Sequence, residues 1–161
     1  MKQLRSIAYR MMTERGLPPD FSPAALLETR ALIDAPPVTD PSVRDLRKLL
    51  WCSIANDSSR DLDQLSVAES GADSAVKIMV AIADVDVLVK RRSAIDDRAQ
   101  QNTPTVYTAA GIFPMLPEPL STDLTSLGEG QDRLAMGIEM GVDASGALKP
   151  SDVYRPTGHN H

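Results

Sequence analysis

The sequence is poor in cysteine and in aromatic residues. Cys52 is the only cysteine among 161 residues, so a disulfide within the chain is excluded, and we expect a reducing compartment, the cytoplasm. Because Cys52 follows Leu50 and Trp51 in an apolar run, we expect its thiol to be buried as a small hydrophobic group. Only six residues are aromatic, so the core must rest on aliphatic side chains, methionine and alanine.

Long apolar runs are also missing. The longest, residues 76–89, is interrupted by Lys77, Asp84 and Asp86, and it falls short of the roughly 20 apolar residues that span a bilayer. We therefore expect no membrane association. The arginine-containing start, which has no acidic residue before Glu14, also resembles an organelle transit peptide, and this alternative stays open.

Positive charge is not in excess. Seventeen Lys and Arg residues against 22 Asp and Glu residues give a net charge of −5, which argues against a protein that holds nucleic acid by its overall charge. Residues 1–50 carry eight basic and six acidic residues, whereas residues 51–161 carry nine and sixteen. The acidic residues are thus concentrated in the second part, where clustered carboxylates could bind cations.

Two amphipathic helices are predicted at the start of the chain. In residues 2–15 the apolar residues recur at helical spacing and Gly16 ends the pattern, while Ser22-Pro23 provides a cap and a first-turn proline for a second helix that extends to about Ile33. We interpret both helices as packing elements. A partner-docking role for residues 2–33 is the alternative.

The remaining chain predicts an α+β fold, with N-terminal helices followed by an antiparallel, β-rich region. Ser93 caps a further helix over residues 93–102, and four prolines between Thr103 and Pro119 predict an irregular path there. The predicted strands are residues 49–54, 64–69, 76–83 and 133–142, with residues 147–154 returning as a partner of the last strand. His159 and His161 lie at the end of the chain, where a solvated tail is more common than a metal site.

One loop carries three carboxylates within seven residues. Asp57, Asp61 and Asp63 lie between two predicted strands, and Asp61 and Asp63 would point to the same side of an extended segment. Carboxylates held close together repel one another, and Mg²⁺ relieves that repulsion because it prefers oxygen ligands. Near a phosphodiester, such a cation could polarise the phosphoryl oxygen and activate water. A solvated loop with aspartates as turn formers is the alternative.

Several segments follow one another in a characteristic order. They are Trp51–Ile54, Asp57–Leu65, Ala68-Glu69, Val80–Val85, Asp96-Asp97, Ala99, Asn102–Tyr107, Phe113–Ser121, Ser126-Leu127 and Asp132–Ala135. Their order resembles the opening of the RNB catalytic domain of the ribonuclease II and ribonuclease R family. The resemblance covers roughly residues 45–155, and its most specific parts are the Arg-Asp-x-Asp and Pro-Met-Leu-Pro motifs.

The resemblance implies a Mg²⁺-dependent 3′→5′ exoribonuclease that hydrolyses single-stranded RNA to nucleoside 5′-monophosphates. Asp61 and Asp63 match two of the four carboxylates in the family's Asp-x5-Asp-x-Asp-Asp cluster, which implies catalytic and metal-binding roles for both. Tyr107 matches the tyrosine that stacks against the RNA near its 3′ end, as an aromatic ring can do without sequence preference.

The cluster departs from the family pattern at two positions. The first carboxylate position is occupied by Ala55, which cannot bind a metal, and the fourth by Gln64, which is a neutral oxygen donor. Asp57 lies two residues from Ala55, and a substitute at a different place in space is not expected to restore the site. Catalysis by this chain is therefore an open question.

By this resemblance we divide the chain into a helical N-terminal segment (residues 1–44), a partial RNB catalytic domain (residues 45–155) and a tail outside the family pattern (residues 156–161). Because family members have a longer catalytic domain, the chain resembles the front portion of one. A partial sheet without its helical cover would expose apolar surface, so the remainder of such an enzyme, or a second copy of the chain, is an expected partner besides single-stranded RNA.

Two further classes of function stay open. The first is a non-catalytic RNA-binding or regulatory fragment, for which Lys90-Arg91-Arg92 is the strongest basic cluster, although a solvated helix end is the commoner role of such a cluster. The second is an interaction protein that docks a partner through its helices.

Overall fold

The computed structural model describes residues 2–32, 40–57 and 59–161, which form two compact units. The first unit contains the described residues of 1–34 and 86–120, and the second contains those of 35–85 and 121–161. The chain therefore passes from the first unit to the second and back before it ends in the second. The predicted α+β class is confirmed, with helices in the first unit and a sheet in the second.

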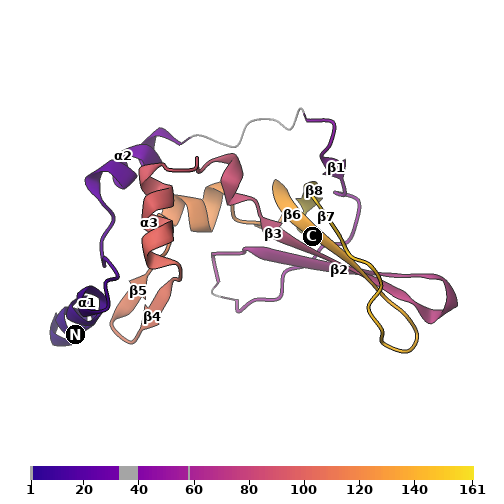
Figure 1. Cartoon of the computed structure of the whole chain (residues 1–161), viewed down its shortest axis with the longest axis horizontal. Coiled ribbons are helices and arrows are strands. Elements are labelled where there is room, and N and C mark those ends of the chain that lie inside the picture. Colours follow the sequence, from indigo (N-terminus) through magenta and orange to yellow (C-terminus); the bar gives the residue numbers. More distant parts are fainter. Residues whose placement is uncertain (1, 33–39, 58) are drawn as a thin grey trace. The chain divides into compact units, whose positions relative to one another are not determined.

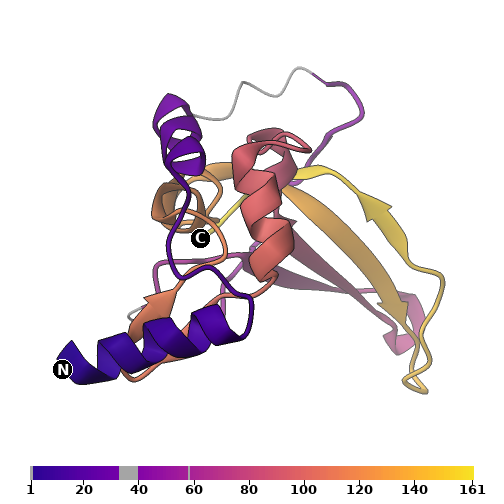
Figure 2. The same cartoon turned by 60° about the vertical axis from the view of Figure 1, so that its left-hand side comes forward.

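Three helices and a hairpin make up the first unit (Figure 2). These elements are α1 (Lys2–Glu14), α2 (Pro23–Ala31), α3 (Ala94–Asn102), β4 (Val106–Thr108) and β5 (Gly111–Phe113). The predicted caps are present, since Ser22 Oγ accepts from the Ala25 N–H at 3.1 Å and Ser93 Oγ accepts from the Asp96 N–H at 3.3 Å. All three predicted helices are confirmed, while Ile33, the expected end of the second, lies outside the described residues.

The hairpin corrects the prediction of an irregular path over residues 103–119. β4 and β5 pair antiparallel, with Tyr107 opposite Ile112, and the Thr108 hydroxyl donates to the Gly111 carbonyl at 2.7 Å across the turn. The four prolines lie before and after these strands, so the N–H groups that the pairing needs are all present. The prolines therefore flank the hairpin and do not interrupt its strands.

A six-stranded sheet forms the second unit (Figure 1). Its strands run in the order β1, β8, β6, β3, β2, with β7 also paired to β6, and every pairing is antiparallel except that of β1 with β8. Short helical turns occur at η1 (Ala72–Ser74), η2 (Val85–Val87) and η3 (Leu120–Leu124). The strands are β1 (Arg44–Asp45), β2 (Gln64–Ser70), β3 (Val76–Ala83), β6 (Asp132–Val142), β7 (Asp152–Tyr154) and β8 (Pro156–His159).

The core of this sheet lies on the face that carries the small residues of β6. Ala135 of β6 is buried there together with Trp51, Leu65, Met79, Ala81 and Leu127. The larger side chains of β6 and β3 alternate onto the opposite face, where Ile82 and Met136 are paired and each is more than a third exposed. We call this opposite surface the apolar sheet face; it consists of Ile78, Val80, Ile82, Met136, Ile138 and Met140.

The predicted strand over residues 49–54 is reduced to two isolated bridges. Trp51 pairs with Asn160, and Cys52 pairs with Ser66 of β2. The Trp51 side chain is 1% exposed, so the next side chain along the extended backbone points outward, and Cys52 is exposed. The expectation of a buried thiol was therefore wrong.

The expected solvated tail is instead part of the sheet. β8 pairs with both β6 and β1, and the Asn160 amide, which is 3% exposed, donates to the Leu127 carbonyl at 2.8 Å. This pairing supplies hydrogen-bond partners for N–H and C=O groups along one edge of β6 that would otherwise be unpaired. The domain boundaries at residues 44 and 155 stay a prediction. Within the described part of the chain, none of the helices has the length and apolar character needed to cross a bilayer.

Candidate active site

The two candidate aspartates lie on a short extended segment that precedes β2. Leu62 separates Asp61 from Asp63, and its backbone is held on both sides: its N–H donates to Ser126 Oγ at 3.2 Å, and its carbonyl accepts from the Leu127 N–H at 2.7 Å. The Asp63 carbonyl accepts from the Ala83 N–H at 2.9 Å. The backbone of the segment is thus fixed by the rest of the second unit.

Asp61 and Asp63 line one pocket with a volume of about 160 Å³. Ala55 and Gln64 line the same pocket, so the fold brings together all four positions that the sequence matches to the carboxylate cluster. Three of these positions carry side-chain oxygen atoms, and the fourth carries only a methyl group. Asp57 is not among the lining residues, and therefore it does not take the place of the missing carboxylate.

The donor set of this pocket suits a partly hydrated magnesium ion. Mg²⁺ is commonly bound through one or two carboxylates together with water and substrate phosphate, and the pocket lining includes two carboxylate residues, Asp61 and Asp63, and also Gln64. No three His, Cys, Asp or Glu side chains in the described ranges are grouped so that they could hold a metal. The pocket therefore fits an open magnesium site that water and phosphate complete.

Tyr107 lies in the first unit, on β4 of the hairpin. Its side chain is 65% exposed, and its cross-strand neighbour Ile112 is 62% exposed, whereas Phe113 at the end of β5 is 5% exposed. The alternation of the hairpin thus turns Tyr107 outward, where its ring has an accessible face. The aspartates belong to the second unit, so the structure places the tyrosine and the carboxylates on different units.

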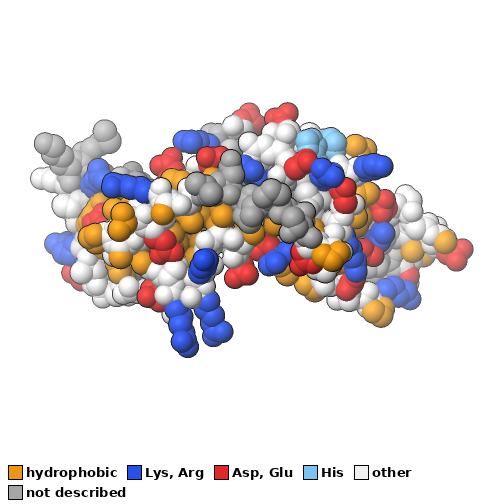
Figure 3. Space-filling view, turned by 90° about the horizontal axis from the view of Figure 1, so that it is seen from above, with side chains coloured by type: hydrophobic (Ala, Val, Ile, Leu, Met, Phe, Trp, Pro, Cys, Tyr) orange, Lys and Arg blue, Asp and Glu red, His pale blue; other side chains and the backbone are white. Residues whose placement is uncertain are grey.

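The basic cluster Lys90-Arg91-Arg92 forms an exposed turn just before α3. Arg92 has a positive φ of 66°, and its N–H donates to the Asp96 carboxylate at 2.6 Å. On the face seen in Figure 3, acidic and basic side chains are interspersed without a continuous basic band. On that face, a contact with nucleic acid would therefore depend on individual side chains.

Sequence reasoning missed the role of Ser126. Its hydroxyl, in a residue only 4% exposed, accepts from the Leu62 N–H and donates to the Arg60 carbonyl at 3.2 Å. It therefore positions the segment that carries both aspartates. The pair Ser126-Leu127 was part of the matched pattern, but local sequence gives no sign that it contacts residues more than 60 positions away.

Comparisons with known proteins all indicate the same family. The sequence model of the RNB domain family matches residues 43–157. Ribonuclease R of Vibrio parahaemolyticus is 38% identical over 117 residues, which cover 73% of this chain, and ribonuclease R 2 of Lactococcus lactis is 33% identical over 155 residues, which cover 89%.

The fold agrees with a solved relative. The structure of Mycoplasma genitalium RNase R in complex with double-stranded RNA superposes with a TM-score of 0.86 at 26% identity, and the match covers 97% of this chain and 28% of that one. The chain spans 14% of the Vibrio protein and 23% of the Lactococcus protein. Since the family model matches most of its residues, the chain belongs to the RNB family of ribonucleases.

Proposed function

We propose that this chain carries part of the active site of a 3′→5′ exoribonuclease that hydrolyses single-stranded RNA to nucleoside 5′-monophosphates. The observation that carries the proposal is the pocket that Asp61, Asp63 and Gln64 line together. Membership of the RNB family supports the same reaction class. We also propose a cytoplasmic location, for which the single cysteine is the support.

Each site residue has a distinct task in this proposal. Asp61 and Asp63 hold Mg²⁺ through their carboxylates, and the fixed Leu62 backbone keeps the two side chains at one pocket. When bound, the ion supplies Lewis-acid polarisation of the phosphoryl oxygen and a lowered pKa for bound water. Tyr107 stacks on a base of the RNA, a contact that tolerates any sequence because every base has a π-face.

The test is cleavage of a 5′-labelled single-stranded RNA by the purified chain. Stepwise shortening is expected with Mg²⁺ and should disappear with EDTA and in Asp63→Asn. Asp57→Asn is the matched control, because it removes the same charge from the same loop at a residue that does not line the pocket. Shortening that persists in Asp63→Asn would contradict the assignment, since it would show that the cleavage does not need this carboxylate.

A second candidate is a non-catalytic RNA-binding or protein-interaction fragment. Two observations favour it. Ala55 provides no oxygen ligand at one position of the pocket, and Ile82 and Met136 of the apolar sheet face are partly exposed. Such a face is typical of surfaces that bind another protein element. We propose that its occupant is the remainder of an RNB catalytic domain or a second copy of this chain.

Folded protein that leaves the RNA intact in Mg²⁺ would favour this second function. Sedimentation velocity should then reveal concentration-dependent association, and Ile138→Lys, which places a charge in the middle of the apolar sheet face, should reduce it. A protein that stays monomeric at all concentrations, with and without this substitution, would argue against self-association.

A further inference from the structure

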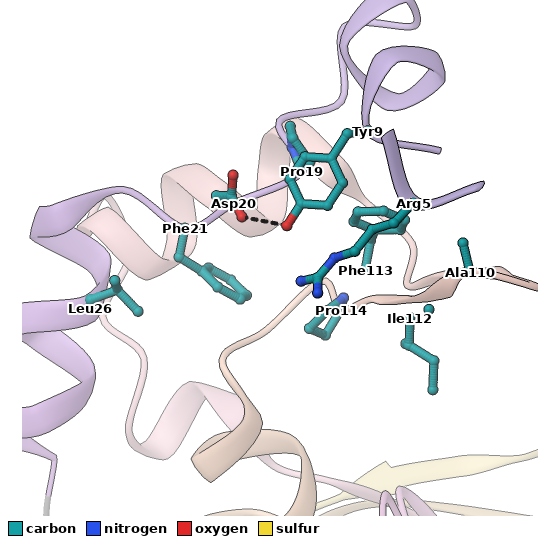
Figure 4. A pocket seen from close by; sticks show the side chains of 11 residues that line it. Arg5, Tyr9, Pro19, Asp20, Phe21, Leu26, Ala110, Ile112, Phe113 and Pro114 are labelled. Atoms are coloured by element: carbon teal, nitrogen blue, oxygen red, sulfur yellow. Dashed lines mark hydrogen bonds between the residues drawn. The ribbon is translucent and has the colours of Figure 1, made fainter. Parts of the chain in front are cut away.

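The first unit contains a pocket that takes no part in the function proposed above. Its volume is about 530 Å³, within the range of about 300–1,000 Å³ that is typical of small-molecule sites. Figure 4 shows the side chains around it, with Tyr9 and Arg5 from α1, Phe21 and Asp20 from the loop before α2, and Phe113 from the end of β5.

Aromatic rings line the pocket from more than one element. Tyr9 and Phe113 form an edge-to-face pair with ring centroids 5.3 Å apart and planes at 70°. Phe113 is 5% exposed, so this pair is anchored in the core of the unit. Phe21 faces the same space from another side (Figure 4), and the guanidinium of Arg98 lies 4.8 Å from the centre of its ring. The pocket thus presents fixed aromatic surface.

Two polar groups complete the lining. The Tyr9 hydroxyl donates to Asp20 Oδ1 at 3.0 Å, so the carboxylate is oriented at the edge of the ring. The Arg5 side chain extends toward the middle of the pocket (Figure 4), with Cζ 5.7 Å from the centre of the Tyr9 ring. Within the described ranges, Arg5 forms no ion pair with a carboxylate.

We propose that this pocket binds one nucleotide of single-stranded RNA. The rings of Tyr9 and Phe21 offer stacking surface to a base, the Asp20 carboxylate accepts from an N–H group at the edge of the base, and Arg5 pairs with the phosphate. A lipid tail or an apolar peptide side chain would use the rings but would offer no negative charge to Arg5, which is exposed.

The position of the pocket agrees with this ligand. Ile112 lines the pocket and lies directly opposite Tyr107 in the hairpin. The same hairpin therefore forms part of the pocket wall and also carries Tyr107, the residue that we propose stacks on RNA. The inference therefore rests in part on the proposed function, which assigns RNA to Tyr107. It adds a second contact for the strand on the same unit, outside the carboxylate pocket.

The test measures binding of a fluorescein-labelled oligouridylate of eight nucleotides by anisotropy, in EDTA so that hydrolysis is suppressed. Arg5→Gln is expected to raise Kd by about fivefold or more, because it removes a charge-assisted contact to phosphate. Arg10→Gln is the matched control: it removes the same charge from the same helix, at an exposed residue paired with Glu14 and absent from the pocket lining. We expect it to change Kd by less than about twofold.

A second pair of variants tests the ring. Tyr9→Phe keeps the stacking surface and should leave Kd within about threefold, while Tyr9→Leu should weaken binding by about fivefold or more, since base stacking contributes on the order of 1–3 kcal/mol. Circular dichroism identifies any variant that fails to fold, and the exposed Arg5 provides a test that does not disturb the core.

The results separate this inference from the proposed function. Equal weakening by Arg5→Gln and Arg10→Gln, or no RNA binding by the folded wild-type chain, would overturn the nucleotide pocket. Hydrolysis that depends on Asp63 could still be observed in the first of these cases. Conversely, a selective effect of Arg5→Gln in a chain that cleaves no RNA would keep the pocket and favour the non-catalytic function.

Discussion

Asp84 and Arg155 join the end of β3 to the residue between β7 and β8, with Arg155 Nε 2.6 Å from Asp84 Oδ2. The aspartate side chain is only 2% exposed, whereas that of the arginine is 38% exposed. A buried carboxylate thus has its counter-charge at the surface of the second unit. This ion pair connects the middle of the sheet to its C-terminal strands.

Removal of the positive charge should therefore destabilise the fold. Arg155→Gln leaves the Asp84 carboxylate buried without its counter-charge, and we expect a loss of about 3 kcal/mol in the free energy of unfolding, measured by urea denaturation. Lys149→Gln is the control, because it breaks an exposed pair with Asp143 and should cost at most about 1 kcal/mol. Equal effects of the two substitutions would refute a special role of the buried carboxylate.

Restoring a carboxylate at position 55 should strengthen metal binding. Ala55 lines the pocket with Asp61 and Asp63, so Ala55→Asp would add a third negative charge at the ion. An opposite charge at about 4 Å contributes on the order of 1 kcal/mol even in water, and we expect Mg²⁺ or Mn²⁺ affinity to rise about tenfold in calorimetric titration. Ala144→Asp, at an exposed position of the loop after β6, should leave the affinity unchanged.

Loss of the Ser126 hydroxyl should loosen the aspartate segment. Ser126→Ala removes the acceptor for the Leu62 N–H and the donor to the Arg60 carbonyl, at an expected cost of about 1–2 kcal/mol in the free energy of unfolding. If the hydroxyl positions Asp61 and Asp63, metal affinity should fall as well. Metal titration under conditions in which the variant is fully folded can measure this affinity. An unchanged metal affinity would mean that Ser126 contributes to stability alone. Ser151→Ala, at an exposed loop residue, is the control.

The carboxyl of Asp45 should titrate in a window set by Arg47. Arg47 donates to both carboxylate oxygens, at 2.8 and 2.7 Å, and these hydrogen bonds lower the pKa of Asp45 from 3.8 to about 2. The pKa of Asp132 is lowered too, by hydrogen bonds first from His159 and then from Arg47. Because the folded-state pKa of each group lies below its unfolded value, the stabilisation is present above about pH 4 and is lost as the pH falls through the folded-state value.

Carboxyl-detected NMR titration can check this. In Arg47→Gln the pKa of Asp45 should rise toward 3.8. Arg44 donates to Asp152 and not to Asp45, so in Arg44→Gln the pKa of Asp45 should stay near 2. A pKa of Asp45 that remains near 2 without Arg47 would show that another group lowers it.

Local sequence determined the helices and the long strands. Ser22 and Ser93 cap helices as expected, and the alternation over residues 133–142 predicted a strand that the structure extends by one residue to Asp132. These elements were predictable because the caps and the apolar periodicity act between residues a few positions apart. The match of Asp61, Asp63 and Tyr107 to a family pattern was also visible in the sequence, and their proposed roles stay predictions.

Only the tertiary structure decided which surfaces are buried and which residues meet. The alternation in β6 predicts two faces, but it does not show which face packs against the core. The fold buries the face with the small residues. An added Cβ at Gly137 would lie 2.9 Å from the Tyr154 ring and 3.0 Å from Pro156. The meeting of Ser126 with Leu62 and the pairing of β8 with β6 likewise join residues far apart in sequence. Such contacts depend on the path of the whole chain, and a local pattern carries no information about that path.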